Sequence, residues 1–142
     1  MKKYPLKITE SSFLADIITP VSAYLKLRDQ FVNVLLLESS DYHGEEDSYS
    51  YICCDPIATF ETYQGISRCT YPDGSKEEIT SDPLKALKKF KSLFEFKKTK
   101  AKYIETGLFG YINYDAVVHF EEIKIREATS NTQDIPEIRY SL

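Results

Sequence analysis

An apolar run that stops at a cluster of polar side chains constrains this chain most. Residues 34–37 read Val-Leu-Leu-Leu, and they are followed at once by Glu38, Ser39, Ser40 and Asp41. An uninterrupted apolar run predicts a buried β-strand, which we place over residues 32–38. A rigid strand that presents polar groups at its end suits a small-molecule site, because apolar surroundings strengthen each polar contact. The sequence therefore predicts a candidate binding site where this strand ends.

Further strands follow this first one, separated by turn signals. They are predicted over residues 49–54, 57–63, 66–71 and 76–79. We expect Asp55-Pro56 to end the first of them. Gln64-Gly65 joins the next two, and Pro72-Asp73-Gly74 is a strong turn signal. We expect these strands to form an antiparallel meander.

Two helices are predicted from their first residues. Thr19-Pro20 and Asp82-Pro83 each combine a good N-cap with proline at the first helical position. The first helix is expected to end near Asp29-Gln30. The second carries apolar residues along one face, with polar residues on either side. Together with the strands, the helices predict an α+β fold, in which an antiparallel sheet has helices packed on one face.

The last third of the chain contains two nearby glycines in a predicted strand. Gly107 and Gly110 lie within the strand predicted over 107–113, and such a pair indicates close backbone approach or a bulge. A short helix is predicted over 114–121, a loop over 122–134 and an extended segment after it. The alternating residues 137–142 stop in mid-pattern, so we expect unpaired edges and apolar surface that favour self-association.

Composition excludes several classes of function. The chain has 142 residues, which is one domain's worth, and a net charge of −4, which argues against a general nucleic-acid or membrane-surface role. Eleven tyrosines without tryptophan fit a sheet that another part of a protein overlies. A lysine-rich stretch favours a solvated helix face, with a polyanion site as the alternative; its members are Lys85, Lys88, Lys89, Lys91, Lys97, Lys98, Lys100 and Lys102.

No catalytic residue and no metal ligand is predicted. Cys53 and Cys54 are neighbours whose side chains point to opposite strand faces, so they suit buried thiols in a reducing cytoplasm better than a metal site. No apolar segment follows Lys2 and Lys3, so no secretory signal is predicted. His43 suits a surface loop, His119 a packed or capping position. Residues 45–47 are acidic but lack EF-hand spacing.

Three groups of motifs carry a resemblance to a known family. They are Thr19 to Leu27; Leu36-Leu37-Glu38-Ser39 with Tyr49-Ser50-Tyr51-Ile52 and Asp55-Pro56; and Gly107 to Tyr111 with Tyr114 to Val117 and Phe120-Glu121. In this order they resemble the N-terminal region of anthranilate synthase component I, one of the chorismate-utilising enzymes. The family's chain is much longer. The resemblance therefore implies an N-terminal piece, since the family's chorismate and magnesium ligands lie later in its chain.

The resemblance implies a function for the longer protein. The family enzyme converts chorismate to anthranilate and pyruvate with magnesium and with ammonia from a glutamine amidotransferase subunit, component II. This segment would be a scaffold and part of the feedback site for tryptophan, and alone it is expected to be inactive. Para-aminobenzoate synthase component I has the same architecture and remains an alternative. A free-standing small-ligand-binding or interaction domain is the alternative from another class.

The resemblance also implies site residues. The family's Leu-Glu-Ser element binds tryptophan, which points to Leu37, Glu38 and Ser39, with Tyr49 and Ser50 on the adjoining strand. The ammonium group of an amino acid needs acceptors such as Glu38 and Ser39, and its ring needs an apolar wall such as Leu37. Ser48 and Cys53 depart from the family's usual basic residue and glycine. From the residues alone, a turn whose hydroxyls satisfy backbone groups remains the alternative.

Overall fold

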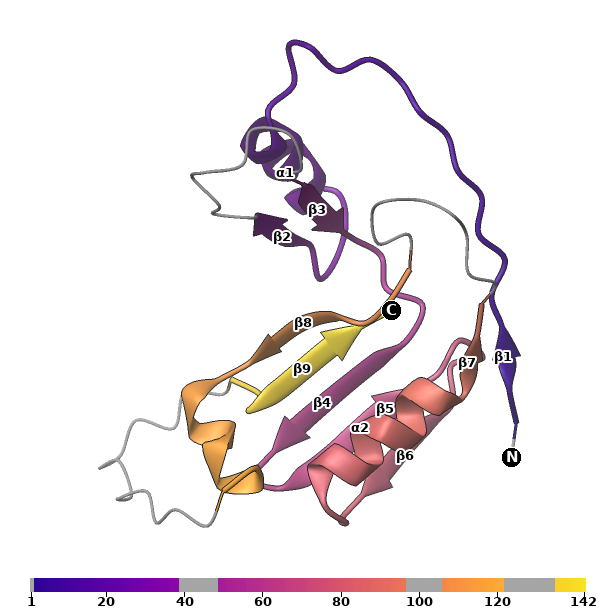
Figure 1. The fold of residues 1–142 in the computed structure, drawn as a ribbon, viewed down its shortest axis with the longest axis vertical. Helices are drawn as coiled ribbons and strands as arrows, with labels where there is room; N and C mark the ends of the chain where they lie inside the picture. The colour runs from indigo at the N-terminus through magenta and orange to yellow at the C-terminus, as the bar shows by residue number, and fades with distance from the viewer. Residues whose placement is uncertain (1, 39–48, 97–105, 122–134) are drawn as a thin grey trace. The chain divides into compact units, whose positions relative to one another are not determined.

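The computed structural model describes residues 2–38, 49–96, 106–121 and 135–142, and it divides into two compact units (Figure 1). The first unit comprises Met1–Leu6, Ile57–Lys97 and Leu108–Leu142. The second comprises Lys7–Pro56 and Lys98–Gly107. The second unit is thus inserted into the first along the chain.

A five-stranded antiparallel sheet forms the first unit (Figure 1). In spatial order its strands are β6 (Lys76–Ile79), β5 (Ile66–Thr70), β4 (Thr59–Tyr63), β9 (Ile138–Ser141) and β8 (Phe109–Ile112). The meander predicted over β4, β5 and β6 is confirmed. Gln64 and Gly65 both have positive φ, at 47° and 76°, which is the conformation that a two-residue hairpin requires.

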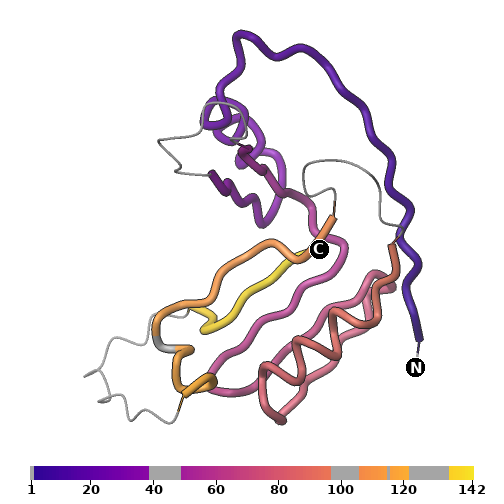
Figure 2. Tube along the Cα trace, viewed as in Figure 1, coloured from indigo at the N-terminus to yellow at the C-terminus, as the bar shows by residue number. Residues whose placement is uncertain are grey.

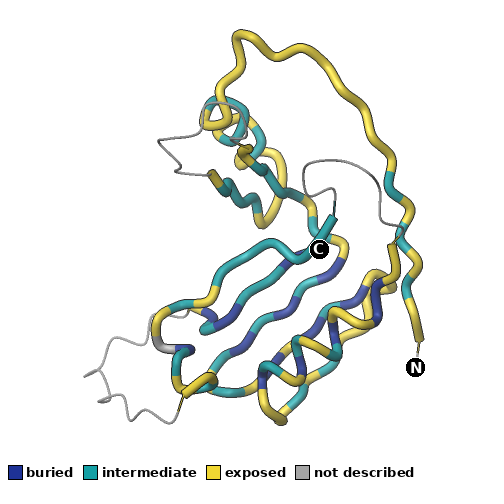
Figure 3. Tube along the Cα trace, viewed as in Figure 1, coloured by how far each residue is buried: buried dark blue, intermediate teal, exposed yellow. Residues whose placement is uncertain are grey.

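Helix α2 (Pro83–Ser92) packs against β4 and β5 (Figure 3). It begins as predicted, because Asp82 Oδ1 accepts hydrogen bonds from the backbone N–H groups of Leu84 (2.8 Å) and Lys85 (3.3 Å). Phe90 is buried between helix and sheet, with its ring centroid 5.7 Å from that of Phe60. The core of this unit consists of Ala58, Phe60, Cys69, Tyr71, Ala86, Phe90, Leu93, Phe94, Ala116 and Ile138.

A short parallel pair extends this unit beyond what the sequence predicts. Strand β1 (Tyr4–Pro5) pairs with β7 (Phe94–Glu95), and the Tyr4 ring stacks on Phe94 at 5.7 Å between centroids. Lys2 Nζ lies 2.6 Å from Asp73 Oδ2 in the β5–β6 turn. This ion pair lowers the pKa of Asp73 well below its usual range. Strands of two residues have no alternation to detect, so the pattern of the sequence does not reveal them.

Close backbone approach explains one of the two glycines of the β8 region, where the chain of β8 runs beside that of β9 (Figure 2). Gly110 in β8 lies opposite Tyr140 in β9. A methyl group on Gly110 would overlap the carbonyl oxygen of Arg139 and would lie 2.9 Å from Tyr140 Cα. The predicted close approach is therefore confirmed at Gly110. The short helix that follows is a 3₁₀ helix, η1 (Tyr114–His119).

The second unit is a helix on a hairpin. Helix α1 (Pro20–Arg28) contacts both β2 (Leu35–Glu38) and β3 (Ser50–Cys53), which pair antiparallel. Thr19 caps the helix in a reciprocal box with Ser22, in which each side chain accepts from the other's backbone N–H at 3.1 Å. None of the described residues of this unit is buried.

Two details differ from the predictions. The strand predicted over 49–54 does not join the meander, because β3 pairs with β2 in the second unit. Asp55, with φ of 52°, and Pro56 redirect the chain before β4. Strand β2 begins at Leu35, and not at 32, because Asn33 takes φ of 55°. The loop predicted over 122–134 lies outside the described residues.

The predicted fold class is confirmed: the chain is α+β, with an antiparallel sheet that α2 covers on one face. Helix α1 packs on the hairpin of the other unit. Within the described part of the chain, neither helix has the length and apolar character needed to cross a membrane.

Candidate functional site

The register of the β2–β3 hairpin brings two of the predicted site residues together. Glu38 is the last residue of β2, and Ser50, the first residue of β3, lies directly opposite it. Side chains that face each other across antiparallel strands have Cβ atoms about 4.5–5.5 Å apart. A carboxylate and a hydroxyl therefore stand side by side at the end of the hairpin.

The same register separates Leu37 from Glu38. Neighbouring residues of a strand point to opposite faces, so Leu37, which pairs with Tyr51, lies on the face away from Glu38 and Ser50. Tyr49 is exposed and lies immediately before β3. Ser39 is outside the described residues. The predicted set is thus divided between the two faces of the hairpin.

Two residues of the motif that were not assigned to the site share the face of Glu38. Leu36 and Ile52 form the next pair along that face, and both are half-buried. Strand alternation alone would have found them, since each lies two residues from Glu38 or Ser50. They supply an apolar surface beside the polar pair.

The chemistry of this hairpin end suits a ligand with hydrogen-bond donors. An ionised glutamate only accepts hydrogen bonds, whereas a serine hydroxyl both accepts and donates. Bonds from a ligand ammonium to the Glu38 carboxylate would be charge-assisted and therefore strong. Burial, and secondarily the neighbouring Cys54, raises the pKa of the Cys53 thiol, so this thiol stays neutral at neutral pH.

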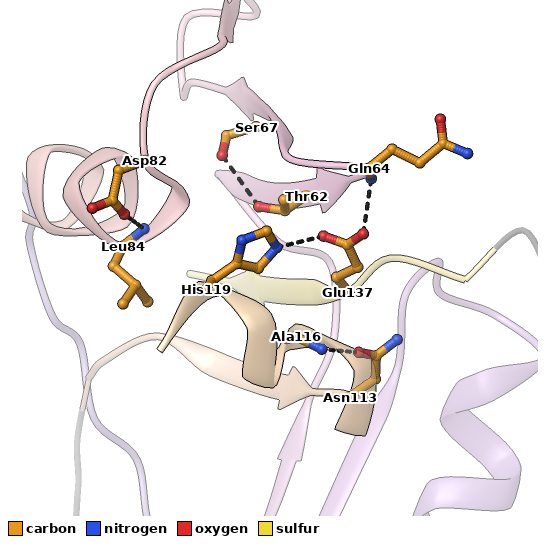
Figure 4. Close-up of polar contacts among 9 residues, drawn as sticks. All are labelled: Thr62, Gln64, Ser67, Asp82, Leu84, Asn113, Ala116, His119 and Glu137. Atoms are coloured by element: carbon orange, nitrogen blue, oxygen red, sulfur yellow. Dashed lines mark hydrogen bonds and ion pairs between the residues drawn. The ribbon is translucent and has the colours of Figure 1, made fainter. Parts of the chain in front are cut away.

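A second polar cluster lies in the first unit, around Glu137 (Figure 4). The His119 Nε2 atom is 2.7 Å from Glu137 Oε2, and both side chains are largely buried. Glu137 Oε1 accepts from the Gln64 N–H at 3.0 Å, so both carboxylate oxygens are engaged. The Glu137 backbone N–H donates to the Thr62 carbonyl at 2.8 Å. The Glu137 backbone carbonyl accepts from the Asn113 N–H, also at 2.8 Å.

Glu137 is therefore a structural junction between the start of β9, the β4–β5 turn, the β8–η1 connection and the end of η1. The prediction that His119 is packed is consistent with its place in this junction. Beside it, the buried hydroxyls of Thr62 and Ser67 satisfy each other at 3.2 Å (Figure 4).

A third cluster joins α2 to the sheet. Tyr71 OH donates to Glu77 Oε2 at 2.5 Å, and Lys89 Nζ donates to Glu77 Oε1 at 2.9 Å. Burial, followed by the bond to Glu77, raises the pKa of Tyr71 far above its usual value. The bonds from Tyr71 and Lys89 lower the pKa of Glu77. The phenol thus stays protonated as a donor to Glu77.

Metal binding finds no support in the described ranges. No three His, Cys, Asp or Glu side chains of these residues come together in a way that could hold a metal ion. The magnesium expected for the longer family enzyme stays a prediction.

Comparison with known proteins gives the family context. No protein-family model matches the chain. It is 35% identical over 127 residues to anthranilate synthase component 1 of Saccharomyces cerevisiae. That match covers 84% of this chain and 22% of the yeast protein. It is 33% identical over 113 residues to the protein of that name from Thermus thermophilus, covering 79% of this chain and 23% of the relative.

A third relative, from Bacillus caldotenax, carries the same name and is 28% identical over 113 residues. The match covers 78% of this chain and 22% of that protein. The chain thus spans about a fifth of the length of the curated relatives it matches. The resemblance predicted from the motifs is confirmed: over most of its residues, this chain is homologous to a segment of anthranilate synthase component 1.

Proposed function

We propose that this chain acts as the N-terminal regulatory and scaffold segment of an anthranilate synthase component 1. In such an enzyme, chorismate is converted to anthranilate and pyruvate, and a glutamine amidotransferase subunit supplies the ammonia. The homology and the motif order support this assignment. The segment itself contributes no catalytic group, and its partners are the remainder of component 1 and the amidotransferase.

The proposed regulatory role is to provide part of a tryptophan site on the β2–β3 hairpin. The single observation that carries this proposal is the pairing of Glu38 with Ser50. The ligand ammonium lies against these two groups, with Ser39 next to them in sequence. The ring rests on Leu36 and Ile52, which share their face. Leu37 supports the hairpin from the other face, and Tyr49 flanks Ser50.

The test separates inhibition from catalysis in a component 1 enzyme that carries this segment. Ser50→Ala and Glu38→Gln should each weaken tryptophan inhibition about 10- to 100-fold, because a hydrogen bond to a charged group contributes roughly 1.5–3 kcal/mol. Ser39→Ala should act in the same way. The uninhibited rate of anthranilate formation should stay within twofold, since allosteric coupling requires a site distinct from the chemistry.

Glu78→Gln is the matched control, because Glu78 is an exposed strand carboxylate of the other unit. It should leave the inhibition constant unchanged. The proposed site is wrong if the Ser50 and Glu38 variants keep the wild-type inhibition constant, or if turnover and inhibition fall together.

A further inference from the structure

The second unit exposes a concentration of large apolar side chains. Phe13, Leu14 and Ile17 are 80%, 84% and 96% exposed. Ile18, Val21 and Leu25 follow at 44–48%. We call the six residues Phe13, Leu14, Ile17, Ile18, Val21 and Leu25 the apolar stripe. Single exposed apolar residues are common on protein surfaces, but a dense run of them marks an interaction site.

Within the unit itself, nothing described buries this stripe. The apolar side chains of α1 fall into two groups. Ala23, Tyr24 and Leu27 are half-buried. Val21 and Leu25 lie one helical turn apart and are exposed. Helix α1 therefore has apolar side chains on two sides. Removing large apolar side chains from water is favourable, so a partner that covered the stripe would gain a large driving force.

The character of the stripe indicates the kind of surface that covers it. Asp16 is the only charged residue between residues 11 and 25. Interfaces with so little charge resemble a domain core cut in half, and they are typical of permanent association. A nucleic acid, a lipid headgroup or a charged peptide would find no matching groups on this surface.

We infer that the apolar stripe docks against the part of a component 1 chain that this sequence does not match. This inference rests on the proposed function. The matched relatives contain more than three-quarters of their length outside the matched segment, so a covalently attached partner exists in them. Tethering within one chain gives an effective concentration in the millimolar range for short linkers, which a second copy at micromolar concentration does not reach.

The experiment compares two settings for the same 142 residues. In one, the chain is alone; in the other, it replaces the matched segment of the Thermus thermophilus relative. Hydrogen exchange of backbone amides in 13–25 should be at least tenfold slower in the long chain, because docking protects them. Ile17→Glu should remove that protection and lower the Tm of the long chain by several degrees, while it leaves the Tm of the isolated chain unchanged.

Tyr114→Glu is the control, since Tyr114 is similarly exposed, at 86%, but lies in the first unit. It should change neither protection nor Tm in either setting. Equal exchange of 13–25 in both settings would overturn the inference, and so would a long chain that does not fold. Protection that grows with the concentration of the isolated chain would show a second copy to be the occupant. Tryptophan inhibition reports on the proposed function separately, through variants of Glu38 and Ser50.

Discussion

Of Gly65, Gly74 and Gly110, Gly110 should tolerate an added methyl group least. It lies in β8 opposite Tyr140, and its Cα has the backbone of β9 against it. In Gly110→Ala, the added methyl would overlap the Arg139 carbonyl oxygen and lie 2.8 Å from the Arg139 carbonyl carbon. The three nearest atoms all belong to backbone, so no side-chain rotation relieves the overlap with them.

The magnitude follows from what must move. Overpacking a well-packed site costs typically about 1–3 kcal/mol when side chains can adjust, and more when they cannot. Here β8 and β9 must separate along their shared ladder. We therefore expect a loss of about 3 kcal/mol or more in the free energy of unfolding. For a chain of this length that corresponds to a fall in Tm of about 10 °C.

The assay is urea and thermal unfolding followed by circular dichroism, with Gly74→Ala as the matched control. Gly74 has a φ of 79°, but no atom lies within 4 Å of where its methyl would be. Its substitution therefore carries only the backbone strain of a left-handed residue, about 1–2 kcal/mol. If Gly110→Ala costs no more than Gly74→Ala, the close approach of β8 and β9 is not what selects glycine here.

Three further predictions test local features. Asp82→Ala should cost about 1 kcal/mol in unfolding experiments, because it removes the N-cap of α2, while Ser81→Ala, at the neighbouring exposed residue, should cost little. Glu137→Ala should cost about 2 kcal/mol by urea unfolding, since it leaves the Gln64 N–H and His119 without acceptors, and Glu137→Gln, which keeps an acceptor oxygen, should cost less. Burial raises the pKa of the Cys69 thiol from 9.0 to about 11. The stability that comes from burying the neutral thiol is therefore complete below pH 9 and is lost as pH rises through 11. The stability of wild type should therefore fall relative to Cys69→Ala between these pH values, and parallel curves would contradict the assignment.

Local signals in the sequence were sufficient for most elements of this fold. The caps Thr19 and Asp82 determine where the two helices begin, and Gln64-Gly65 fixes a tight hairpin, because each of these acts through neighbouring residues. The partner of β3 was not predictable in this way. Whether β3 pairs with the preceding strand β2 or with the following strand β4 depends on the conformation at Asp55. A positive φ at an aspartate has no clear signature in sequence.

The candidate site shows the same division. The motif identified Glu38 and Ser50, and alternation along the strands predicts that residues two apart share a face. Whether Glu38 lies opposite Ser50 depends on the register across the hairpin, which the sequence leaves undetermined because many residues separate the two in the chain. The junction at Glu137 was missed for a related reason: it joins segments that are far apart in the chain, and no local pattern reports on such contacts.

The interior position of β9 in the sheet has a consequence for how the chain folds during synthesis. β9 follows every other described strand in sequence, yet it lies between β4 and β8, and β8 pairs with no other described strand. Until β9 is made, the β4 edge is an open template for other chains. At about 5–20 residues per second, the stretch from β4 to β9 takes seconds to synthesise. A nascent chain therefore passes through an interval of seconds in which the β4 edge is open to pairing with other chains.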